Sequence, residues 1–408
     1  MRAVKRKPKV VFVNRFFWPD ESATSQILSD VCEHLAASGW GVTVITSRLS
    51  YSNPSDRFSS RQTWKNVKIV RVRTSGFGRG NIIGRALDYF SFYLSSFFSL
   101  LRHVRSGDIL VMKTDPPLIS IPAGVAGRIR GARRINWLQD LFPEVATSLG
   151  MRLPFGFFLR SGRNRSLNTA TTNIVIGETM AARLRKLGVQ ENKIETIANF
   201  ADEISLSPDA NGIHQLRAKW GIETEDFIVG YSGNLGRAHE FETVLGAAEI
   251  LKDDPRLKFL FVGGGQLRQL VEGSVAERGL SNVIFRPYQP RSELAISLGV
   301  PDLHWVSLRP ELEGLIVPSK IYGVAAVGRP IIMIGDRNGE VGSLLAQHDF
   351  GFTVPPSASL ELSALIRDLS ADRDTARRLG ANARKFAQTV GARSTAFRRW
   401  AQLLRDLG

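Results

Sequence analysis

Two short segments in the second half of the sequence combine glycines with basic side chains, which suits a phosphate ligand. The first runs from Tyr231 to Arg237 and contains Gly233, Asn234 and Gly236. Glycines let the backbone approach a ligand closely, the start of a helix offers unpaired N–H groups, and an arginine adds a planar set of donors. These residues favour a diphosphate, although an ordinary strand-to-helix turn with a solvated arginine also fits them. The glycine spacing does not match a dinucleotide fingerprint or a P-loop.

The second segment, residues 315–330, contains Pro318, Ser319 and Lys320. Ser319 suits the N-cap of a helix, and Gly328 suits its end. Lys320 would then lie in the first turn, where the helix dipole disfavours a cation. A bound anion between Lys320 and the exposed N–H groups explains this placement. A lysine that points into water explains it as well.

Short apolar runs alternate with helical patterns along the chain, as in parallel sheets covered by helices. The runs of the first half are residues 10–13, 42–46, 67–72, 108–112, 134–138 and 173–176. Those of the second half are residues 227–231, 258–262, 283–285, 303–306 and 330–334. This order predicts an α/β protein with two doubly wound, Rossmann-like domains that face a cleft, with ligands at the carboxyl ends of the strands.

A polar stretch at residues 201–212 separates the two series of strands. A single core rarely grows beyond about 250 to 300 residues, so a chain of this length should divide. We predict an N-terminal domain over residues 1–204 and a second domain over residues 205–385. Residues 386–408 form a basic, amphipathic helical pattern that we expect to cross back to the first domain.

The composition limits the function classes. The chain has 408 residues, 43% hydrophobic and 23% charged, which excludes disorder and collagen. With 54 basic and 38 acidic side chains the net charge is +16, so a negatively charged partner is expected: nucleic acid, anionic lipid or a phosphorylated substrate. One cysteine, Cys32, permits no internal disulfide and fits a cytoplasmic setting. No run of residues is long and apolar enough to span a bilayer.

Six segments, in this order and spacing, carry a resemblance to a known family. They are residues 16–21, 140–144, 175–180, 232–237, 261–265 and 318–330. The chain resembles the retaining glycosyltransferases of family four, which have the two-domain GT-B architecture. Within that family it is most similar to bacterial exopolysaccharide and colanic-acid enzymes. The resemblance implies transfer of a sugar, with retention, from a UDP- or GDP-linked donor.

The resemblance also implies roles for residues of the second domain. Arg237, Lys320 and Glu313 match the positions of the catalytic residues. The positions that match the donor site are Gly233, Asn234, Gly236, Gly264, Arg286, Tyr288, Gly314, Pro318 and Ser319. The sequence departs from the family at its two-glutamate motif, because alignment on Gly328 places Leu315 and Gly323 where the glutamates would stand.

We expect no metal and no cofactor. The segment Asp372-Arg373-Asp374 has the form of a metal-binding aspartate pair, but it precedes a helical pattern, where a capping role is favoured. Arg237 and Lys320 would instead stabilise the charge that develops on the leaving diphosphate. In the retaining reaction that the resemblance implies, an oxygen of this diphosphate takes the proton of the acceptor hydroxyl.

The first domain offers carboxylates and aromatic patches. Candidates for the acceptor side are Glu21, Asp115, Asp140 and Glu144. A helix N-cap is an alternative role for Asp140, and a solvated first-turn carboxylate is an alternative for Glu144.

Two aromatic segments, residues 87–101 and 151–165, are accompanied by arginines. The side chains expected to face a membrane are Phe90, Phe92, Phe97, Phe98, Phe157 and Phe158. Apolar stretches beside basic residues suit an anionic membrane surface. They favour a lipid-linked acceptor, such as a polyprenyl-diphosphate saccharide, and a peripheral position on the inner face of the cytoplasmic membrane. Burial of both segments as core helices is the alternative.

Other function classes fit part of the sequence. A nucleotide-sugar epimerase would use the same donor site but needs paired acid and base carboxylates. A basic, non-catalytic binding protein would explain the charge. Nucleic acid is not an expected partner, because the chain has no basic segment interleaved with base-stacking aromatic residues. The sugar, the nucleotide and the acceptor hydroxyl are not defined by the sequence.

Overall fold

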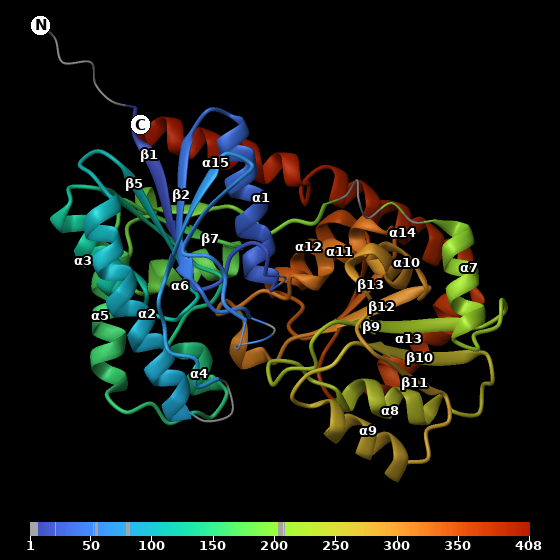
Figure 1. The fold of residues 1–408 in the computed structure, drawn as a ribbon. Coiled ribbons are helices and arrows are strands. Elements are labelled where there is room, and N and C mark those ends of the chain that lie inside the picture. The colour runs from blue at the N-terminus through green and yellow to red at the C-terminus, as the bar shows by residue number, and fades with distance from the viewer. Residues whose placement is uncertain are drawn as a thin grey trace, which may run out of the picture. The chain divides into compact units, whose positions relative to one another are not determined.

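A computed structural model describes residues 7–20, 22–51, 53, 56–78, 82–202, 207 and 209–408. The chain divides into two compact units (Figure 1). Unit 1 comprises Met1–Ala198 and Phe397–Gly408, and unit 2 comprises Asn199–Ala396. Glu21 and the expected domain boundary between residues 204 and 205 lie outside the described residues.

Unit 1 is built on an eight-stranded sheet of order β3-β4-β2-β1-β5-β6-β7-β8. All neighbouring strands pair in parallel except the edge strand β3, which is antiparallel to β4. The strands are β1 (Lys9–Val13), β2 (Gly41–Ser47), β3 (Arg61–Trp64), β4 (Val67–Val72), β5 (Ile109–Lys113), β6 (Arg133–Trp137), β7 (Thr172–Val175) and β8 (Ile194–Thr196). The central strands are buried, as their continuous apolar runs predict.

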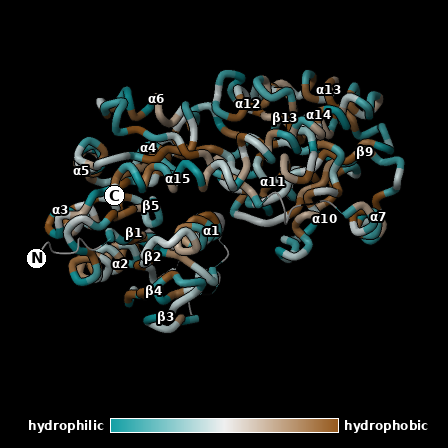
Figure 2. Tube along the Cα trace, turned by 90° about the horizontal axis from the view of Figure 1, so that it is seen from above, coloured by the Kyte–Doolittle hydropathy of each residue, from teal (hydrophilic) through white to brown (hydrophobic). Residues whose placement is uncertain are grey.

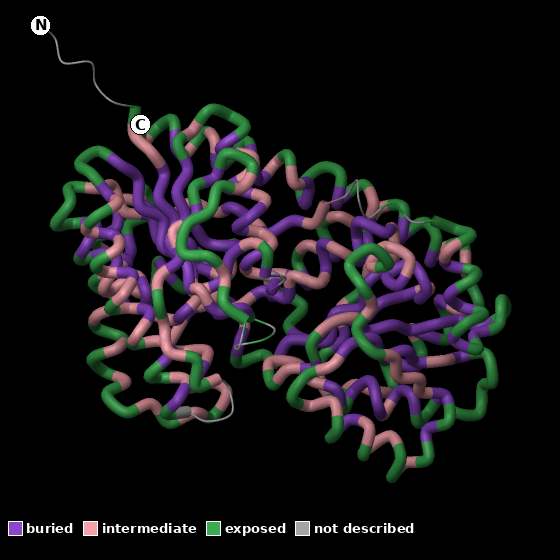
Figure 3. Tube along the Cα trace, in the orientation of Figure 1, coloured by how far each residue is buried: buried purple, intermediate pink, exposed green. Residues whose placement is uncertain are grey.

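Helices cover this sheet, and their outer faces are exposed while the central strands are buried (Figure 3). They are α1 (Ala23–Ala37), α2 (Ile82–His103), α3 (Ser120–Ile129), α4 (Glu144–Ser148), α5 (Gly156–Thr169) and α6 (Glu178–Lys186). Helix α2 packs on α3, and α3 packs on α5. These three helices therefore form one continuous layer of unit 1.

Unit 2 is built on a six-stranded parallel sheet of order β11-β10-β9-β12-β13-β14, the strand order of a dinucleotide-binding fold. Its strands are β9 (Phe227–Ser232), β10 (Leu257–Val262), β11 (Val283–Arg286), β12 (Leu303–Ser307), β13 (Ile331–Ile334) and β14 (Gly351–Val354). Its helices are α7 (Ala210–Lys219), α8 (Glu242–Ile250), α9 (Arg268–Glu277), α10 (Leu294–Gly299), α11 (Lys320–Ala326), α12 (Glu340–His348), α13 (Ser359–Ala371) and α14 (Arg373–Gln388).

The last helix, α15 (Arg393–Leu407), follows α14 after a break at residues 389–392. Its residues from Phe397 onward belong to unit 1. The Trp400 ring is 4.7 Å from that of Trp137 and 6.0 Å from that of Phe12, and Trp400 is 1% exposed. The end of the chain thus contributes to the core of unit 1.

In the described residues, no helix is both long enough and apolar enough to cross a membrane.

Candidate functional site

Two glycine loops meet where strands β9 and β10 end. Gly233 N–H donates to Val262 O at 2.9 Å, and Leu235 N–H donates to Gly264 O at 2.7 Å. Gly263 has a φ of 132°, and a Cβ there would lie 2.2 Å from Gly233 O. Only glycine permits this backbone conformation together with so close an approach. The glycines predicted from the sequence therefore hold the two loops against each other at the carboxyl edge of the sheet.

Lys320, the first residue of α11, extends its side chain onto the β9 loop. A Cβ on Gly233 would lie 2.6 Å from Lys320 Cε. Lys320 Nζ donates to Tyr231 Oη at 2.5 Å, to His239 Nε2 at 2.8 Å and to Asn234 O at 3.5 Å. In the part of the chain that the structure describes, these acceptors are all uncharged. Lys320 is therefore a cation without a carboxylate partner.

Burial determines the protonation of this group. It lowers the pKa of Lys320 to about 7. Burial, followed by the nearby lysine, lowers the pKa of His239 to about 3, so this imidazole is neutral at pH 7. Its Nδ1 lies 2.7 Å from Ser307 O, which assigns the proton to Nδ1 and leaves Nε2 as an acceptor for Lys320.

Two further predicted residues lie on the same loops. Arg237 is exposed and belongs to the β9 loop. Tyr288 is 59% exposed, and its hydroxyl donates to Gly264 O at 3.4 Å. A Cβ on Gly264 would lie 3.2 Å from the Tyr288 ring, so this ring lies directly over the β10 loop. We call Gly233, Asn234, Gly236, Arg237, Gly264, Tyr288 and Lys320 the donor-side cluster.

Other residues predicted for this site have structural partners. The Arg286 guanidinium donates to Trp220 O at 2.7 Å and to Phe285 O at 2.9 Å. Glu313 Oε1 accepts from Glu340 N at 2.9 Å, at the start of α12, where a carboxylate is favoured by the dipole. Contacts of Arg286 and Glu313 with a donor stay predictions.

The segment before α11 is correctly located, but one detail differs from the prediction. Ser319 stands at the N-cap position with helical backbone angles, and its side chain makes no capping hydrogen bond there. Gly314 is buried with a φ of 73°, and Pro318 is buried beside Ser319. These residues fix the approach of the chain to Lys320.

Unit 1 contains a cavity of about 260 Å³ near the carboxyl ends of β1 and β5. Among its lining residues are Arg15, Tyr51, Tyr89 and Asp115. The Arg15 guanidinium pairs with Asp88 at 3.3 Å and lies 5.2 Å from the centre of the Tyr89 ring. Aromatic faces beside a carboxylate and a guanidinium suit the hydroxyls and the apolar face of a sugar. Of the predicted acceptor-side residues, Asp115 lies in this cavity.

Asp140 is not the N-cap of a helix, because α4 begins at Glu144 and Pro143 occupies the cap position. Burial, and then the nearby Asp115 carboxylate, raises the pKa of Asp140 to about 7. Lys113, which is completely buried, is a neighbour of opposite charge. Burial lowers the pKa of Lys113 to about 7, and its Nζ lies 3.9 Å from the centre of the Trp137 ring.

Glu144 forms an ion pair with Arg163, which is 4% exposed, and so connects α4 to α5. It is therefore not a solvated carboxylate. Whether Glu144 contacts an acceptor stays a prediction.

The predicted membrane-facing residues divide into two groups. Phe90, Phe98, Phe157 and Phe158 are between 61% and 78% exposed. The prediction for Phe92 was wrong: this residue is 0% exposed, because it lies on the face of α2 that packs on the sheet. Phe97 is partly buried and also packs against the core.

An apolar stripe remains on the outer face of α2, where hydrophobic and hydrophilic residues alternate along the helix (Figure 2). It consists of Ile83, Leu87, Phe90, Leu94 and Phe98. The spacing of three or four residues places them on one face.

The sequence did not indicate Tyr231 and His239, which hold Lys320, or Ser307, which holds His239. It also did not indicate Arg15 in the cavity of unit 1. Their local sequence gave no signal, because their partners are distant in the chain.

The aspartate pair of the C-terminal half has the capping role that was predicted. Asp372 accepts hydrogen bonds from the backbone N–H of Thr375 at 3.0 Å and from its hydroxyl at 2.7 Å. Among the described residues, the structure contains no group of three His, Cys, Asp or Glu side chains that could hold a metal ion.

Two units, each a largely parallel sheet covered by helices, define a protein of the double Rossmann class. Residues 213–386 match the family "Glycosyl transferases group 1", and residues 23–199 match "Glycosyl transferase 4-like domain". The chain is a glycosyltransferase with the GT-B fold.

Curated relatives agree with this assignment. The chain is 26% identical over 360 residues to the putative colanic acid biosynthesis glycosyl transferase WcaI of Escherichia coli K12, which covers 82% of this chain and 85% of WcaI. It is 24% identical over 277 residues to the probable glycosyltransferase WbjE of Pseudomonas aeruginosa, which covers 66% of this chain and 68% of WbjE.

Solved structures share the fold at lower identity. Sucrose-phosphate synthase from Thermosynechococcus elongatus has a TM-score of 0.77 at 19% identity, covering 98% of this chain and 99% of that chain. Anabaena HepE, in complex with UDP-glucose, has a TM-score of 0.74 at 15% identity, covering 98% of this chain and 99% of that chain.

Proposed function

We propose that this chain transfers a sugar, with retention and without a metal ion, from a UDP- or GDP-sugar to a lipid-linked saccharide of a bacterial surface polysaccharide. Unit 2 would bind the donor and unit 1 the acceptor. The names of the relatives support polysaccharide assembly, and the HepE complex supports a UDP-sugar donor.

One observation carries the donor assignment: the Lys320 ammonium is held by three uncharged acceptors. A partly buried cation without a counter-charge is disfavoured, in line with the lowered pKa of Lys320, and a diphosphate would supply that charge. The Gly233 and Gly264 loops leave room for the backbone to approach phosphate oxygens. In the proposed site, Arg237 and Lys320 stabilise the negative charge on the departing diphosphate, and the exposed Tyr288 ring stacks on the base.

The acceptor assignment is supported by the cavity of unit 1. In the proposal, the Asp115 carboxylate accepts hydrogen bonds from sugar hydroxyls, and the Tyr89 and Tyr51 rings contact the apolar face of the sugar. The apolar stripe of α2 lies against the membrane interface, which brings the lipid carrier to unit 1.

The experiment is a thermal-shift panel of UDP-, GDP- and other nucleotide-sugars. We expect one nucleotide class to raise the Tm of the wild type. The Arg237→Ala and Lys320→Ala variants should bind it at least tenfold more weakly and show smaller Tm shifts, because a charged hydrogen bond contributes about 1.5 to 3 kcal/mol. Arg256→Ala is the matched control, since Arg256 precedes β10 at the opposite edge of the sheet. Equal shifts in all three variants would contradict the donor assignment.

Turnover is tested by incubating the donor with a polyprenyl-diphosphate saccharide and analysing the anomeric configuration of the product by NMR. Inversion would contradict the retaining mechanism. Epimerisation of the donor without an acceptor would favour a nucleotide-sugar epimerase instead.

A further inference from the structure

A groove of about 310 Å³ lies between α3 and α5 on unit 1, away from the residues assigned to either substrate. The two helices approach closely at Gly162, where a Cβ would lie 3.0 Å from Ile121 Cδ1. Val125 and Ile129, one turn apart on α3, line the groove and are 51% and 62% exposed. Part of the groove lining is therefore apolar and open to solvent.

Three arginines complete the lining: Arg128 from α3, Arg134 from β6 and Arg165 from α5. In the described chain, no acidic side chain lines the groove. Arg134 is held in place because its guanidinium donates to Thr169 O at 2.5 Å. Burial, and then repulsion from Arg128, lowers the pKa of Arg134. The positive charges of this groove thus repel one another and have no opposing carboxylate there.

Exposed apolar side chains also lie on α2 and at the start of α5. Helix α2, which packs on α3, carries the exposed stripe that includes Phe90, Leu94 and Phe98. At the start of α5, Phe155, Phe157 and Phe158 are at least 70% exposed. A ligand that combines an anionic head with hydrocarbon chains matches both the arginines and this apolar surface.

We propose that the α3/α5 groove binds the phosphate headgroup of an anionic phospholipid within the bilayer. Arg128 and Arg165 donate hydrogen bonds to the phosphate, Arg134 contributes its fixed charge at the floor, and the acyl chains lie over Val125 and Ile129. The inference rests on the proposed association of unit 1 with a membrane, and it adds a lipid class and the residues that recognise it.

The test measures partition of the full chain onto vesicles. One set contains phosphatidylcholine alone, and the other contains about 30 mol% phosphatidylglycerol, which gives its surface a negative potential. The double variant Arg128→Ser/Arg165→Ser is expected to bind the anionic vesicles about 25-fold more weakly, from about fivefold for each arginine near an anionic surface. Binding to phosphatidylcholine vesicles should change little.

The matched control is Arg61→Ser/Arg73→Ser, which removes the same charge from two exposed positions of unit 1. If both double variants weaken binding equally, the net charge of the protein drives association and the groove is not a site. If neither variant matters while Phe90→Ser and Phe98→Ser abolish binding, the apolar stripe acts alone and the inference fails.

A soluble short-chain phospholipid distinguishes binding of a lipid from binding of a free anion. Below its micelle concentration, dihexanoyl-phosphatidylglycerol should raise the Tm of the wild type but not that of Arg128→Ser/Arg165→Ser. An equal shift with inorganic phosphate would overturn the lipid assignment. The nucleotide-sugar shift of the double variant should equal that of the wild type, so a failure here is distinct from a failure of the donor site.

Discussion

At the scale of single residues, the proposed donor site depends on Lys320 and on the uncharged groups that hold it. Tyr231, His239 and the Asn234 carbonyl orient the ammonium without neutralising its charge. The free protein therefore keeps a lysine whose pKa is lowered to about 7, ready to gain a proton when an anion binds.

Binding of the nucleotide should be linked to protonation of Lys320. At pH 8 a lysine with a pKa of about 7 is mostly uncharged, and a diphosphate beside it raises that pKa. We expect uptake of nearly one proton per nucleotide, measured by calorimetry in buffers of different ionisation enthalpy. Lys320→Met should show no uptake. Equal uptake by both proteins would place the titrating group elsewhere.

The backbone of the glycine loops gives a second prediction. Gly263→Ala places a Cβ against Gly233 O. The backbone φ of 132° at this position is also strained for any residue with a side chain. We expect loss of nucleotide binding by at least tenfold, together with a lower Tm. Gly279→Ala is the control, because Gly279 also has a positive φ but nothing lies within 4 Å of its added Cβ. This control should lose only about 1 kcal/mol of stability and keep its affinity.

At the scale of elements, helix α2 has two faces with different roles. Phe92 is 0% exposed and belongs to the core, whereas Phe98 is 61% exposed on the outer stripe. A helix on the surface of a protein normally has a polar outer face. An apolar outer face such as that of α2 is unusual unless a partner covers it.

Substitution of these two phenylalanines should separate stability from membrane binding. Phe92→Ala is expected to lower the free energy of unfolding by about 3 to 5 kcal/mol, as for other buried aromatic residues. Phe98→Ala should change it by less than about 0.5 kcal/mol, as at other exposed positions, yet weaken binding to vesicles. Urea denaturation and vesicle flotation measure the two effects. Unchanged flotation of Phe98→Ala would argue against the stripe as a membrane contact.

Most strands could be predicted, because buried parallel strands have continuous apolar runs that need no tertiary information. The short strands β3, β8 and β14 were missed. Residues 61–64 are polar and lie at a sheet edge, and residues 194–196 are only partly buried, so neither has a buried strand's pattern.

Part of the candidate site could also be located from the sequence, and its role in donor binding stays a prediction. Glycines and cations after a strand indicated the candidate donor loops, since their chemistry is local. Contacts such as the one between Lys320 and Tyr231, 89 residues apart, arise only when the chain folds. The buried face of α2 could not be predicted either, because aromatic residues occur on all sides of this helix.

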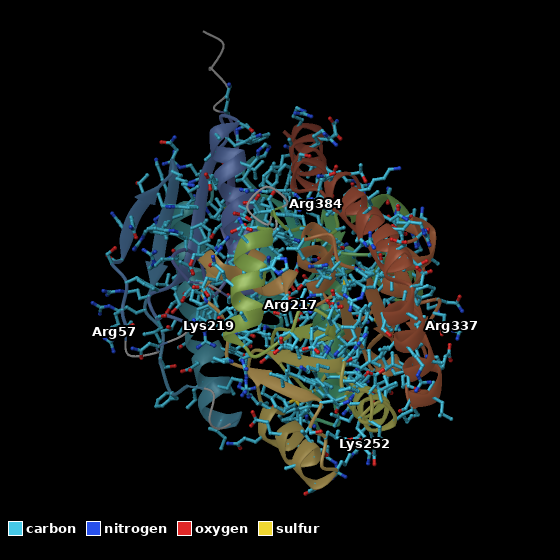
Figure 4. The ribbon with its side chains drawn as sticks, turned by 90° about the vertical axis from the view of Figure 1, so that its right-hand side faces the viewer. Arg57, Arg217, Lys219, Lys252, Arg337 and Arg384 are labelled. Carbon is cyan, nitrogen blue, oxygen red and sulfur yellow. The ribbon has the colours of Figure 1, made fainter. Side chains whose placement is uncertain are left out.

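At the scale of the whole molecule, the positive charge is distributed over the surface of both units. Arg57, Lys219, Lys252 and Arg337 are exposed and extend from the ribbon in Figure 4, whereas Arg217 is 8% exposed. Arg217 instead donates to Asp226 O at 2.7 Å within unit 2. Binding to an anionic surface should therefore fall with ionic strength for every variant, and only the comparison of matched variants identifies a site.

The C-terminal helix packs in unit 1, far along the chain from the rest of that unit. Its contribution to the stability of unit 1 can be tested. Trp400→Ala removes a buried ring that contacts Trp137 and Phe12, and should cost about 3 to 5 kcal/mol. Gln402→Ala, an exposed position on the same helix, is the control. Denaturation followed by tryptophan fluorescence measures both variants. Equal stability of the two would mean that residues 397–408 do not support unit 1.

The contribution of Trp400 also has a consequence for biosynthesis. The ribosome makes residues 1–198 first, but the segment that completes their core is among the last twelve residues, 397–408. At about 5 to 20 residues per second, the nascent first unit waits roughly 10 to 40 seconds for it. During that interval Trp137 and Phe12 lack their partner, so we expect the nascent first unit to expose apolar surface that the finished protein buries.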